Sequence, residues 1–380
     1  MISEERIRSA FLELAAIDSE SYREKAIGKA VTARLRALGL EVITEGTTGR
    51  GFLNLHPDSH PNILARLKGT APGDPVLFSA HLDTVSPGTN KEPVVVEDGT
   101  IRSAGETVLG ADDLCGIVSI LEALRVIREE NLPHPDIEVL ITPAEEPFCE
   151  GSRYLDFKQI RSRTGYVLDL TGPIGTAAVS APTIVSFEAV VRGRAAHAGF
   201  NPEEGINALN ITVKTLAEIR TGRLDGNTTV NVGTIQGGTG NNIVPERVRV
   251  TGEVRSLVHS EADRIVREIL DRFSENARKA GGIAYCSSTE RIRAYRVEAE
   301  DPAVRRFRAG CEAEKIPSRL VDTLGGSDAN RLNEAGISAI VTACGMENVH
   351  STEETTNIKD LIQSARLTLR LMTLKEEQSL

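Results

Sequence analysis

The chain has 380 residues, 40% of them hydrophobic and 26% charged, which is the composition of an ordinary soluble globular protein. Its formal net charge of −10 argues against a nucleic-acid partner, because such binding needs a basic face. No apolar run approaches the ~20 residues that cross a bilayer, and the N-terminal residues lack the basic-then-apolar order of a signal peptide, so we expect no membrane association.

The first 180 residues alternate helices with strands. Apolar residues at helical spacing predict helices over residues 5–17, 23–38 and 114–128. Short apolar runs predict strands over 40–43, 62–67, 76–80, 137–141 and 165–168. Residues 94–96 and Ile101 flank a hairpin turn signal at 97–99. The stretch 53–61 gives no clear pattern. Strand, acidic turn and helix recur, which is typical of an α/β domain whose functional side chains gather at the carboxyl ends of strands.

A second domain is expected over residues 181–297, because a chain of this length is long for one hydrophobic core. The predicted elements follow the order β-α-β-β-α-β of one ferredoxin-like unit, over 184–191, 206–219, 229–235, 247–254, 261–277 and 284–292. This unit would be inserted into the larger domain, residues 1–180 and 298–380. There the chain continues with helices at 304–311, 328–335 and from 358, and with strands at 319–322 and 337–343.

The five cysteines are scattered, odd in number and without a Cys-x-x-Cys pair. This usage is typical of reduced thiols in the cytoplasm, and not of a disulfide frame or a thiolate zinc site. We therefore expect a cytoplasmic protein whose functional site relies on nitrogen and oxygen atoms.

Six ligand-type residues follow strands or lie in turns: His81, Asp112, Glu145, Glu146, Asp169 and His350. Imidazole and carboxylate groups without sulfur suit zinc, manganese or cobalt. We interpret them as a site for two metal ions, which typically lie about 3.5–4 Å apart. In this interpretation Asp112 is the shared ligand.

The other ligands divide between the two metals. His81 and Asp169 would complete one site, and Glu146 and His350 the other. Asp83 lies two residues after His81, so on an extended chain it points the same way and could fix the imidazole tautomer. Glu145 would act as the general base that takes a proton from the attacking water and delivers it to the leaving amine.

Each of these patterns also has a simpler explanation. Asp112 and Asp113 before a helix can be an N-cap with a first-turn acid. The pair Glu145 and Glu146 can be a solvated face, and a single histidine after a strand can be an ordinary surface residue. The recurrence of such residues at successive strand ends favours the metal site.

Four segments carry a resemblance to a known family: His81-Leu82-Asp83-Thr84, Leu109-Gly110-Ala111-Asp112-Asp113, Ala144-Glu145-Glu146 and Val349-His350-Ser351. They resemble the metal motifs of the di-zinc aminoacylase and carboxypeptidase clan of metallopeptidases, and most closely its peptidase T (tripeptide aminopeptidase) branch. The resemblance implies a zinc-exopeptidase-type α/β/α catalytic domain with an inserted lid that mediates homodimerisation. It also implies two zinc ions per subunit and a cis peptide bond between Asp112 and Asp113.

The resemblance extends to the predicted lid. His197, in Arg194-Ala195-Ala196-His197-Ala198-Gly199, is similar to a histidine that helps to hold the oxyanion, usually in the partner subunit. Four further positions resemble substrate-binding residues, and these are Asn242, Arg255, Gly325 and Gly326. Arg255 would suit a peptide carboxylate because a guanidinium binds both oxygens. Alternatively, His197 could cap a turn and Arg255 could pair with Glu253.

The first hypothesis is thus a two-zinc peptidase that hydrolyses the amide bonds of short peptides. A second is a deacylase of N-acyl amino acids or a carboxypeptidase of the same clan, since the same metals serve all three reactions. A third is a non-catalytic peptide-binding homologue, which the presence of Glu145 and every expected ligand disfavours.

Overall fold

The computed structural model describes residues 1–44 and 46–374, which divide into two compact units. The first contains residues 1–180, 296–323 and the chain from 327 onward, and the second contains residues 181–295 and 324–326. The prediction had ended the insert at residue 297 and had left 324–326 in the larger domain. Those three residues belong to the second unit because Gly326 packs closely against Ile292. The contact is so close that a β-carbon added to Gly326 would lie only 2.2 Å from Ile292 Cδ1.

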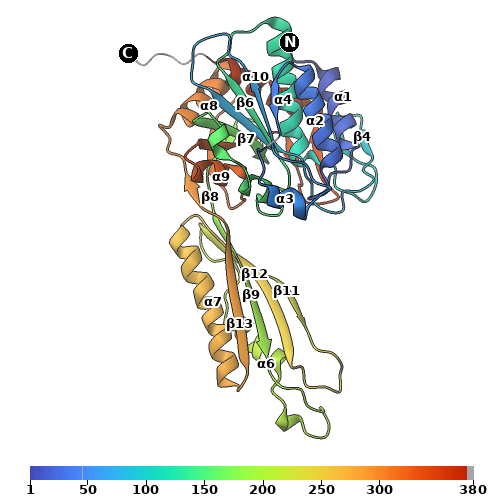
Figure 1. The fold of residues 1–380 in the computed structure, drawn as a ribbon, viewed down its shortest axis with the longest axis vertical. Coiled ribbons are helices and arrows are strands. Elements are labelled where there is room, and N and C mark those ends of the chain that lie inside the picture. The colour runs from blue at the N-terminus through green and yellow to red at the C-terminus, as the bar shows by residue number, and fades with distance from the viewer. Residues whose placement is uncertain (45, 375–380) are drawn as a thin grey trace. The chain divides into compact units, whose positions relative to one another are not determined.

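The first unit is built on a large mixed sheet (Figure 1). Among the described residues its strands lie in the order β1-β2-β6-β3-β7-β16-β8-β14, and β15 also pairs with β8. The strands are β1 (Glu41–Ile43), β2 (Ile63–Leu67), β3 (Val76–His81), β6 (Ile137–Thr142), β7 (Thr164–Leu170), β8 (Thr176–Ala181), β14 (Tyr295–Arg296), β15 (Arg319–Asp322) and β16 (Ser338–Ala343).

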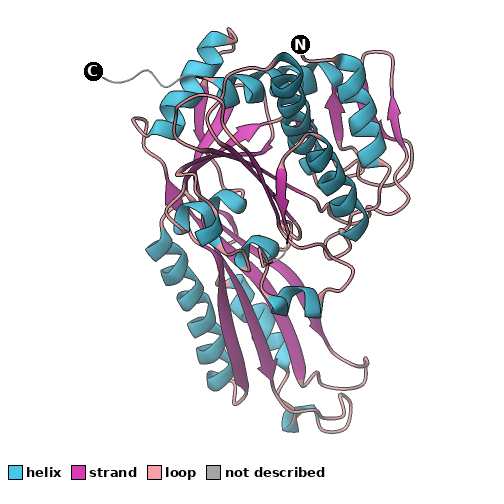
Figure 2. Cartoon of the chain, turned by 45° about the horizontal axis from the view of Figure 1, so that its top comes forward, coloured by secondary structure: helices cyan, strands magenta, loops and turns pink. Residues whose placement is uncertain are grey.

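Helices lie on both sides of this sheet (Figures 1 and 2). Every residue of β3 and of β6 is buried, as expected of strands that are covered on both faces. Helix α4 packs against β3 and β7, and α8 and α9 pack against β7 and β16. The helices are α1 (Glu4–Ala15), α2 (Lys25–Ala37), α3 (Arg50–Leu55), α4 (Ala111–Glu130), α5 (Glu150–Arg153), η1 (Phe157–Gln159), α8 (Pro302–Ala313), α9 (Asp328–Glu334) and α10 (Ile358–Thr373).

A small antiparallel sheet in the same unit joins segments that are far apart in the sequence. Its order is β17-β18-β5-β4, with strands β4 (Pro93–Val95), β5 (Thr100–Ser103), β17 (Met346–Glu347) and β18 (Thr355–Asn357). Thr356 of β18 pairs with Ile101 of β5. The turn between β17 and β18 is thereby held beside the first third of the chain.

The second unit has the predicted ferredoxin-like order of elements. Its antiparallel sheet runs β10-β11-β12-β9-β13, and Val185, Phe187, Ala189 and Val191 of β9 alternate into a core shared with α7. The elements are β9 (Thr183–Arg192), η2 (Pro202–Glu204), α6 (Ala208–Ala217), β10 (Gly222–Arg223), β11 (Thr228–Gly237), β12 (Arg247–Ser256), α7 (His259–Lys279) and β13 (Ile283–Ile292).

The predicted α/β class with an inserted ferredoxin-like domain is confirmed. The expected helices and strands are present, and their ends shift by a few residues. The prediction missed several short elements, including α3, which overlaps the start of the stretch without a clear pattern, and the longer strand β8. Strand β8 reads Thr-Ala-Ala-Val-Ser-Ala, which is small and weakly apolar, so burial by its neighbours decides its conformation.

Candidate active site

Three neighbouring parallel strands carry four of the candidate residues to one edge of the large sheet. Strand β3 pairs in parallel with β6 on one side and with β7 on the other. His81 is the last residue of β3, Asp169 lies near the end of β7, and Glu145 and Glu146 follow β6. Because the carboxyl ends of parallel strands meet at the same edge, these side chains converge there.

Asp112 enters from the start of α4. Gly110 has a φ of +80°, and Asp112 and Asp113 have non-helical backbone angles before the regular helix begins at Leu114. The peptide bond between the two aspartates is cis, as the resemblance had implied. The carboxylate of Asp113 accepts hydrogen bonds from the backbone N–H groups of His81, at 3.2 Å, and Gly116, at 3.1 Å. Asp113 therefore ties the start of α4 to the end of β3.

His350 comes from the turn between β17 and β18. Its Nε2 lies 3.3 Å from Asp112 Oδ2 and 3.0 Å from Glu146 Oε2. The side chain of His350 is 53% exposed, whereas that of Asp112 is 8% exposed. His350 thus contacts the buried site from its solvent side.

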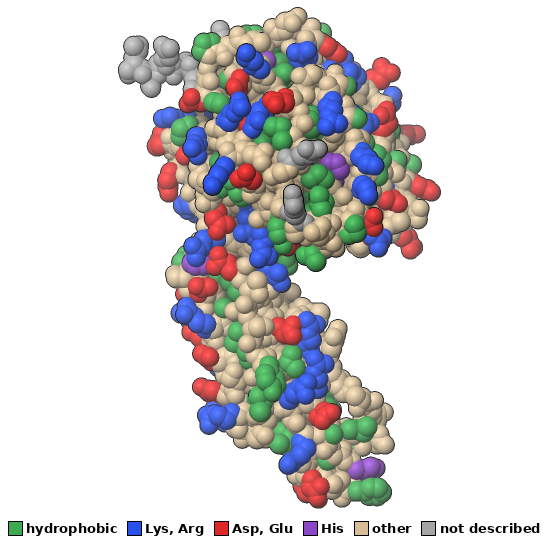
Figure 3. Space-filling model, in the orientation of Figure 1, with side chains coloured by type: hydrophobic (Ala, Val, Ile, Leu, Met, Phe, Trp, Pro, Cys, Tyr) green, Lys and Arg blue, Asp and Glu red, His purple; other side chains and the backbone are tan. Residues whose placement is uncertain are grey.

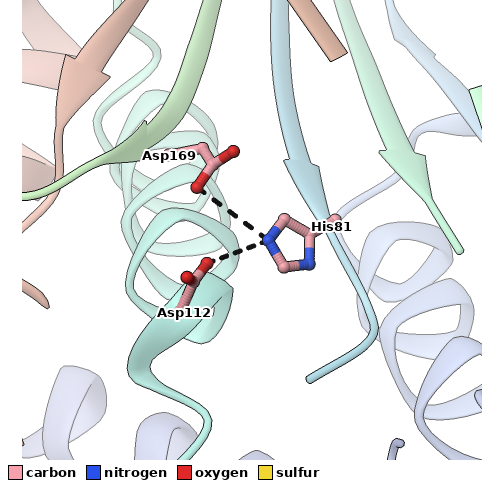
Figure 4. Close-up of side chains that lie close together, drawn as sticks. All are labelled: His81, Asp112 and Asp169. Carbon is pink, nitrogen blue, oxygen red and sulfur yellow. Dashed lines mark hydrogen bonds and ion pairs between the residues drawn. The ribbon is translucent and has the colours of Figure 1, made fainter. Parts of the chain in front are cut away.

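The two oxygens of Asp112 serve two separate groups of side chains. Oδ1 lies 2.9 Å from Nε2 of His81, and the same nitrogen lies 3.9 Å from Asp169 Oδ1 (Figure 4). Oδ2 faces His350. In each group, His81–Asp112–Asp169 and Asp112–Glu146–His350, the candidate ligand atoms all lie within 4.8 Å of one another. The structure therefore brings the five predicted ligands together, in the predicted division and around Asp112.

The donor set suits a cation. Nδ1 of His81 lies 2.9 Å from the carbonyl oxygen of Asp83, so in the neutral ring the lone pair of Nε2 faces the carboxylates of Asp112 and Asp169. A lone pair facing carboxylate oxygens is stable only when a proton or a metal ion lies between them. In addition, Glu146 Oε1 is buried and has no hydrogen-bond partner among the described residues.

The crowding of acids shifts their pKa values. Burial, followed by the charges of neighbouring groups such as Asp169 or Asp112, raises the pKa of Glu145 and of Asp169 well above the usual range. Burial also acts to raise the pKa of Asp112, but hydrogen bonds from His350 and His81 outweigh it and lower that pKa. Hydrogen bonds to Asp112 and Glu146 raise the pKa of His350 to about 10.

Asp83 contacts His81 in a different way from the one predicted. The prediction made its carboxylate the acceptor of the imidazole N–H, but the nearer acceptor is the Asp83 carbonyl oxygen, since the carboxylate Oδ1 is 3.5 Å from Nδ1. The carboxylate instead accepts the backbone N–H groups of Glu145, at 2.8 Å, and Glu146, at 3.2 Å, and the hydroxyl of Ser21, at 2.8 Å. It therefore holds the loop that carries the two glutamates.

Sequence reasoning assigned no role in the site to three buried acids that lie in or beside it, Asp113, Glu354 and Asp328. Asp113 holds His81, as described above, and Glu354 accepts the backbone N–H groups of Gly110 and Asp112. Asp328 accepts the hydroxyl hydrogens of Thr142, at 2.5 Å, and Ser152, next to the glutamate loop. The position of Glu354 four residues after His350, in the same turn, was the available signal, but only the fold shows what it binds.

Comparison with known proteins agrees with this geometry. Residues 179–281 match the model of the peptidase dimerisation domain (M20_dimer), and residues 62–218 match that of peptidase family M28. An aminopeptidase PepT from Bacillus cereus ATCC 10987 is 35% identical, with 98% of both chains covered and a TM-score of 0.88. A tripeptidase from Staphylococcus aureus subsp. aureus Mu50 is 31% identical, with 98% of this chain and 99% of that chain covered and a TM-score of 0.93.

The uncharacterised protein YqjE of Bacillus subtilis (strain 168) is 36% identical over 375 residues, which cover 98% of this chain and 99% of that protein. These likenesses span both units of the chain. The chain belongs to the peptidase T-like family. It is therefore a peptidase, and peptidases of the M20 type depend on metal ions, in line with the two ligand groups around Asp112.

The remaining candidates of this peptidase T-like chain belong to the second unit. His197 is exposed, and its Nδ1 accepts the backbone N–H groups of Gly199 and Phe200, each at 3.1 Å. The ring of Phe200 stacks on the imidazole with centroids 4.1 Å apart. The turn-capping alternative is therefore observed. Because Nδ1 is an acceptor, the hydrogen of a neutral ring lies on Nε2, which is directed away from the turn as a donor.

Arg255 forms the ion pair that the alternative interpretation expected. Its Nε donates to Glu253 Oε1 at 2.7 Å, and its Nη1 donates to the carbonyl oxygen of Leu324 at 3.1 Å. Leu324 directly precedes Gly325 and Gly326. Asn242 is exposed, and its carbonyl oxygen accepts the N–H of Ala198 next to His197. These residues thus form two groups in the second unit, one around His197 and one around Arg255.

A third group of possible ligands, His259, Asp263 and Glu290, also lies in the second unit. Here a guanidinium is already present, because Arg293 Nη2 is 2.8 Å from His259 Nε2 and Arg293 Nε is 3.3 Å from Glu290 Oε1. Arg293 offsets part of the negative charge of Asp263 and Glu290, and its guanidinium occupies the Nε2 side of His259, so we assign no cation to this group.

Acidic and basic side chains are interspersed over the visible face of the larger unit in Figure 3. Among the described residues, no helix combines the length and the apolar character that crossing a bilayer requires.

Proposed function

We propose that this chain is a two-metal exopeptidase that hydrolyses short peptides, with peptidase T-like tripeptide aminopeptidase activity. The observation that carries the proposal is the position of Asp112, whose two oxygens face two separate ligand groups. His81 and Asp169 would hold one ion with Asp112, and Glu146 and His350 the other. Zinc is the first choice for this imidazole and carboxylate set, with manganese or cobalt as alternatives.

Two bound cations would polarise the scissile carbonyl and lower the pKa of the attacking water. The protein supplies the proton transfer. Glu145 lies next to the proposed ligand Glu146 and is 8% exposed. Its backbone N–H donates to the carboxylate of Asp83, which holds the residue in place. A carboxylate at this position can take a proton from water and then donate it to the leaving amine.

The second unit carries the other residues that we propose for binding substrate. His197 presents Nε2–H as a donor for the developing oxyanion, and Asn242 lies beside it in the same group. Arg255 would bind a peptide carboxylate with its remaining donors, next to the loop of Gly325 and Gly326. The match to the dimerisation domain supports a homodimer formed through this unit. The five free thiols support a reducing compartment such as the cytoplasm.

The test combines metal analysis with a substrate screen. The purified protein should bind two equivalents of zinc, lose activity on treatment with a chelator and regain it when zinc is restored. It should release the N-terminal residue of tripeptides faster than it cleaves N-acetyl amino acids or releases C-terminal residues. A preference for N-acyl amino acids would replace the peptidase proposal with a deacylase, and binding of peptides without turnover would indicate a non-catalytic homologue.

A further inference from the structure

Glu354 is a buried carboxylate directed at the turn that carries Asp112. It is 1% exposed and lies in the turn between β17 and β18. Its Oε2 accepts the backbone N–H of Gly110 at 2.7 Å, and its Oε1 accepts that of Asp112 at 2.9 Å. One carboxylate therefore holds both ends of the segment Gly110–Asp112.

These two N–H groups need an external acceptor. The start of a helix leaves its first N–H groups without partners in the helix, and Gly110, the residue before α4, provides no side chain to cap it. The backbone is also irregular at Asp112 and Asp113, so a local cap of the usual kind cannot form. Glu354, which is 242 residues away from Asp112, supplies the missing acceptor.

The same turn contacts Asp112 a second time. His350 lies four residues before Glu354, and its Nε2 is 3.3 Å from Asp112 Oδ2. The backbone of Asp112 is thus held by Glu354 while its carboxylate faces His350. Lys91 is buried, and its Nζ lies beside Gly110: a β-carbon added to this glycine would be 3.1 Å from that nitrogen. The ammonium group of Lys91 offsets the charge of Glu354.

We propose that Glu354 is a positioning residue that orients Asp112, so that one oxygen of Asp112 faces each ligand group. This inference rests on the proposed two-metal function. Rotation of the Asp112 backbone would move Oδ1 away from His81 and Oδ2 away from His350 together. Loss of Glu354 therefore weakens both cation sites at once, although Glu354 itself contacts neither proposed ion.

The experiment compares Glu354→Gln with Glu353→Gln in the full chain. The glutamine has nearly the same shape, but its amide group places a donor against one of the two N–H groups. Glu353 is the matched control, because it is the adjacent residue of the same type and is exposed. Zinc affinity and stoichiometry are measured by calorimetry on the chelator-treated proteins, and unfolding temperature and peptide hydrolysis are measured in parallel.

We expect E354Q to bind both zinc ions about 10–100-fold more weakly, the range found when groups that orient metal ligands are removed. Its activity should recover as zinc is added in excess, which a purely structural defect would not allow. E353Q should match the parent protein. Parent-like zinc affinity in E354Q, or weakening of one site alone, would overturn the inference.

If E354Q does not fold, Glu354→Asp provides the second test, because the shorter side chain keeps the charge but cannot reach both N–H groups. The same loss of affinity is expected, and parent-like affinity in this variant would also overturn the inference. Failure of the proposed function is distinguishable, since in that case the parent protein itself would bind no zinc.

Discussion

Two groups of histidine and acid side chains can be compared in this protein, one around Asp112 and one around His259. Both bring candidate ligand atoms within 4.8 Å of one another. Around Asp112 the acid side chains of Asp112, Glu146 and Asp169 are 8–10% exposed, and the buried carboxylates of Asp113 and Glu354 hold the backbone around them. Around His259 the groups are partly exposed, and Arg293 lies among them. Proximity of ligand atoms alone therefore does not identify a metal site, and we propose one only around Asp112, where the acids are nearly buried and no arginine is among the ligand atoms.

The largest effect should come from removing the shared carboxylate. Asp112→Ala is expected to abolish the binding of both cations and to reduce peptide hydrolysis below detection, because each ligand group loses a member and the cations supply several kcal/mol of transition-state stabilisation. Metal analysis of the purified variant checks this. Retention of one full equivalent of zinc would mean that Asp112 is not shared, and the two groups would then be independent sites.

The second-largest effect, on turnover alone, should come from a substitution that separates catalysis from metal binding around Asp112. Glu145→Gln removes the proposed proton carrier but leaves all five proposed ligands in place. We expect kcat to fall by about 10²–10⁴-fold, the usual contribution of a general base. Zinc stoichiometry should stay at the parent value. Turnover near the parent rate would remove Glu145 from the proposed mechanism.

A smaller effect concerns the charge balance around Gly110. Burial lowers the pKa of Lys91 from its ordinary 10.5 to about 8. Folded Lys91 therefore releases its proton near pH 8, whereas the unfolded chain keeps it until about pH 10.5. Its contribution to the free energy of unfolding rises with pH across this window, by about 3 kcal/mol at most.

Lys91→Met should lack that rise. Denaturant unfolding of both proteins between pH 8 and 10.5 provides the measurement, and the difference between the proteins cancels the titration of other groups. Parallel pH dependences in the two proteins would show that Lys91 keeps an ordinary pKa in the folded state.

The smallest effect on zinc binding and peptide hydrolysis is expected from a substitution in the group around His259. His259→Ala should leave zinc stoichiometry and peptide hydrolysis unchanged, because we assign no cation to this group. Zinc stoichiometry, measured by calorimetry on His259→Ala and Asp112→Ala in parallel, gives the direct comparison. A lost equivalent of zinc in the His259 variant would show that Arg293 does not exclude a cation, and the charge argument would fail.

Much of the architecture was predictable from local patterns. Apolar periodicity predicted the helix over 114–128 and the order of the elements in the second unit, because a buried face repeats at the period of its own element. Strand ends followed by His81, Glu145, Glu146 and Asp169 predicted where these residues meet, since parallel strands share a carboxyl edge. The family resemblance added the cis peptide at Asp112.

Other features depended on contacts between distant segments. The role of Glu354 arises because β18 pairs with β5, and no local pattern announces that pairing. The acceptor for His81 is the carbonyl of Asp83 because the carboxylate is already engaged by the glutamate loop. Likewise, the ligand groups around Asp112 and His259 differ because of what packs around them. The sequence by itself determined the chemical groups and the elements that carry them. The tertiary structure decided which charges face one another and which remain unbalanced, because electrostatic partners are chosen in space and not along the chain.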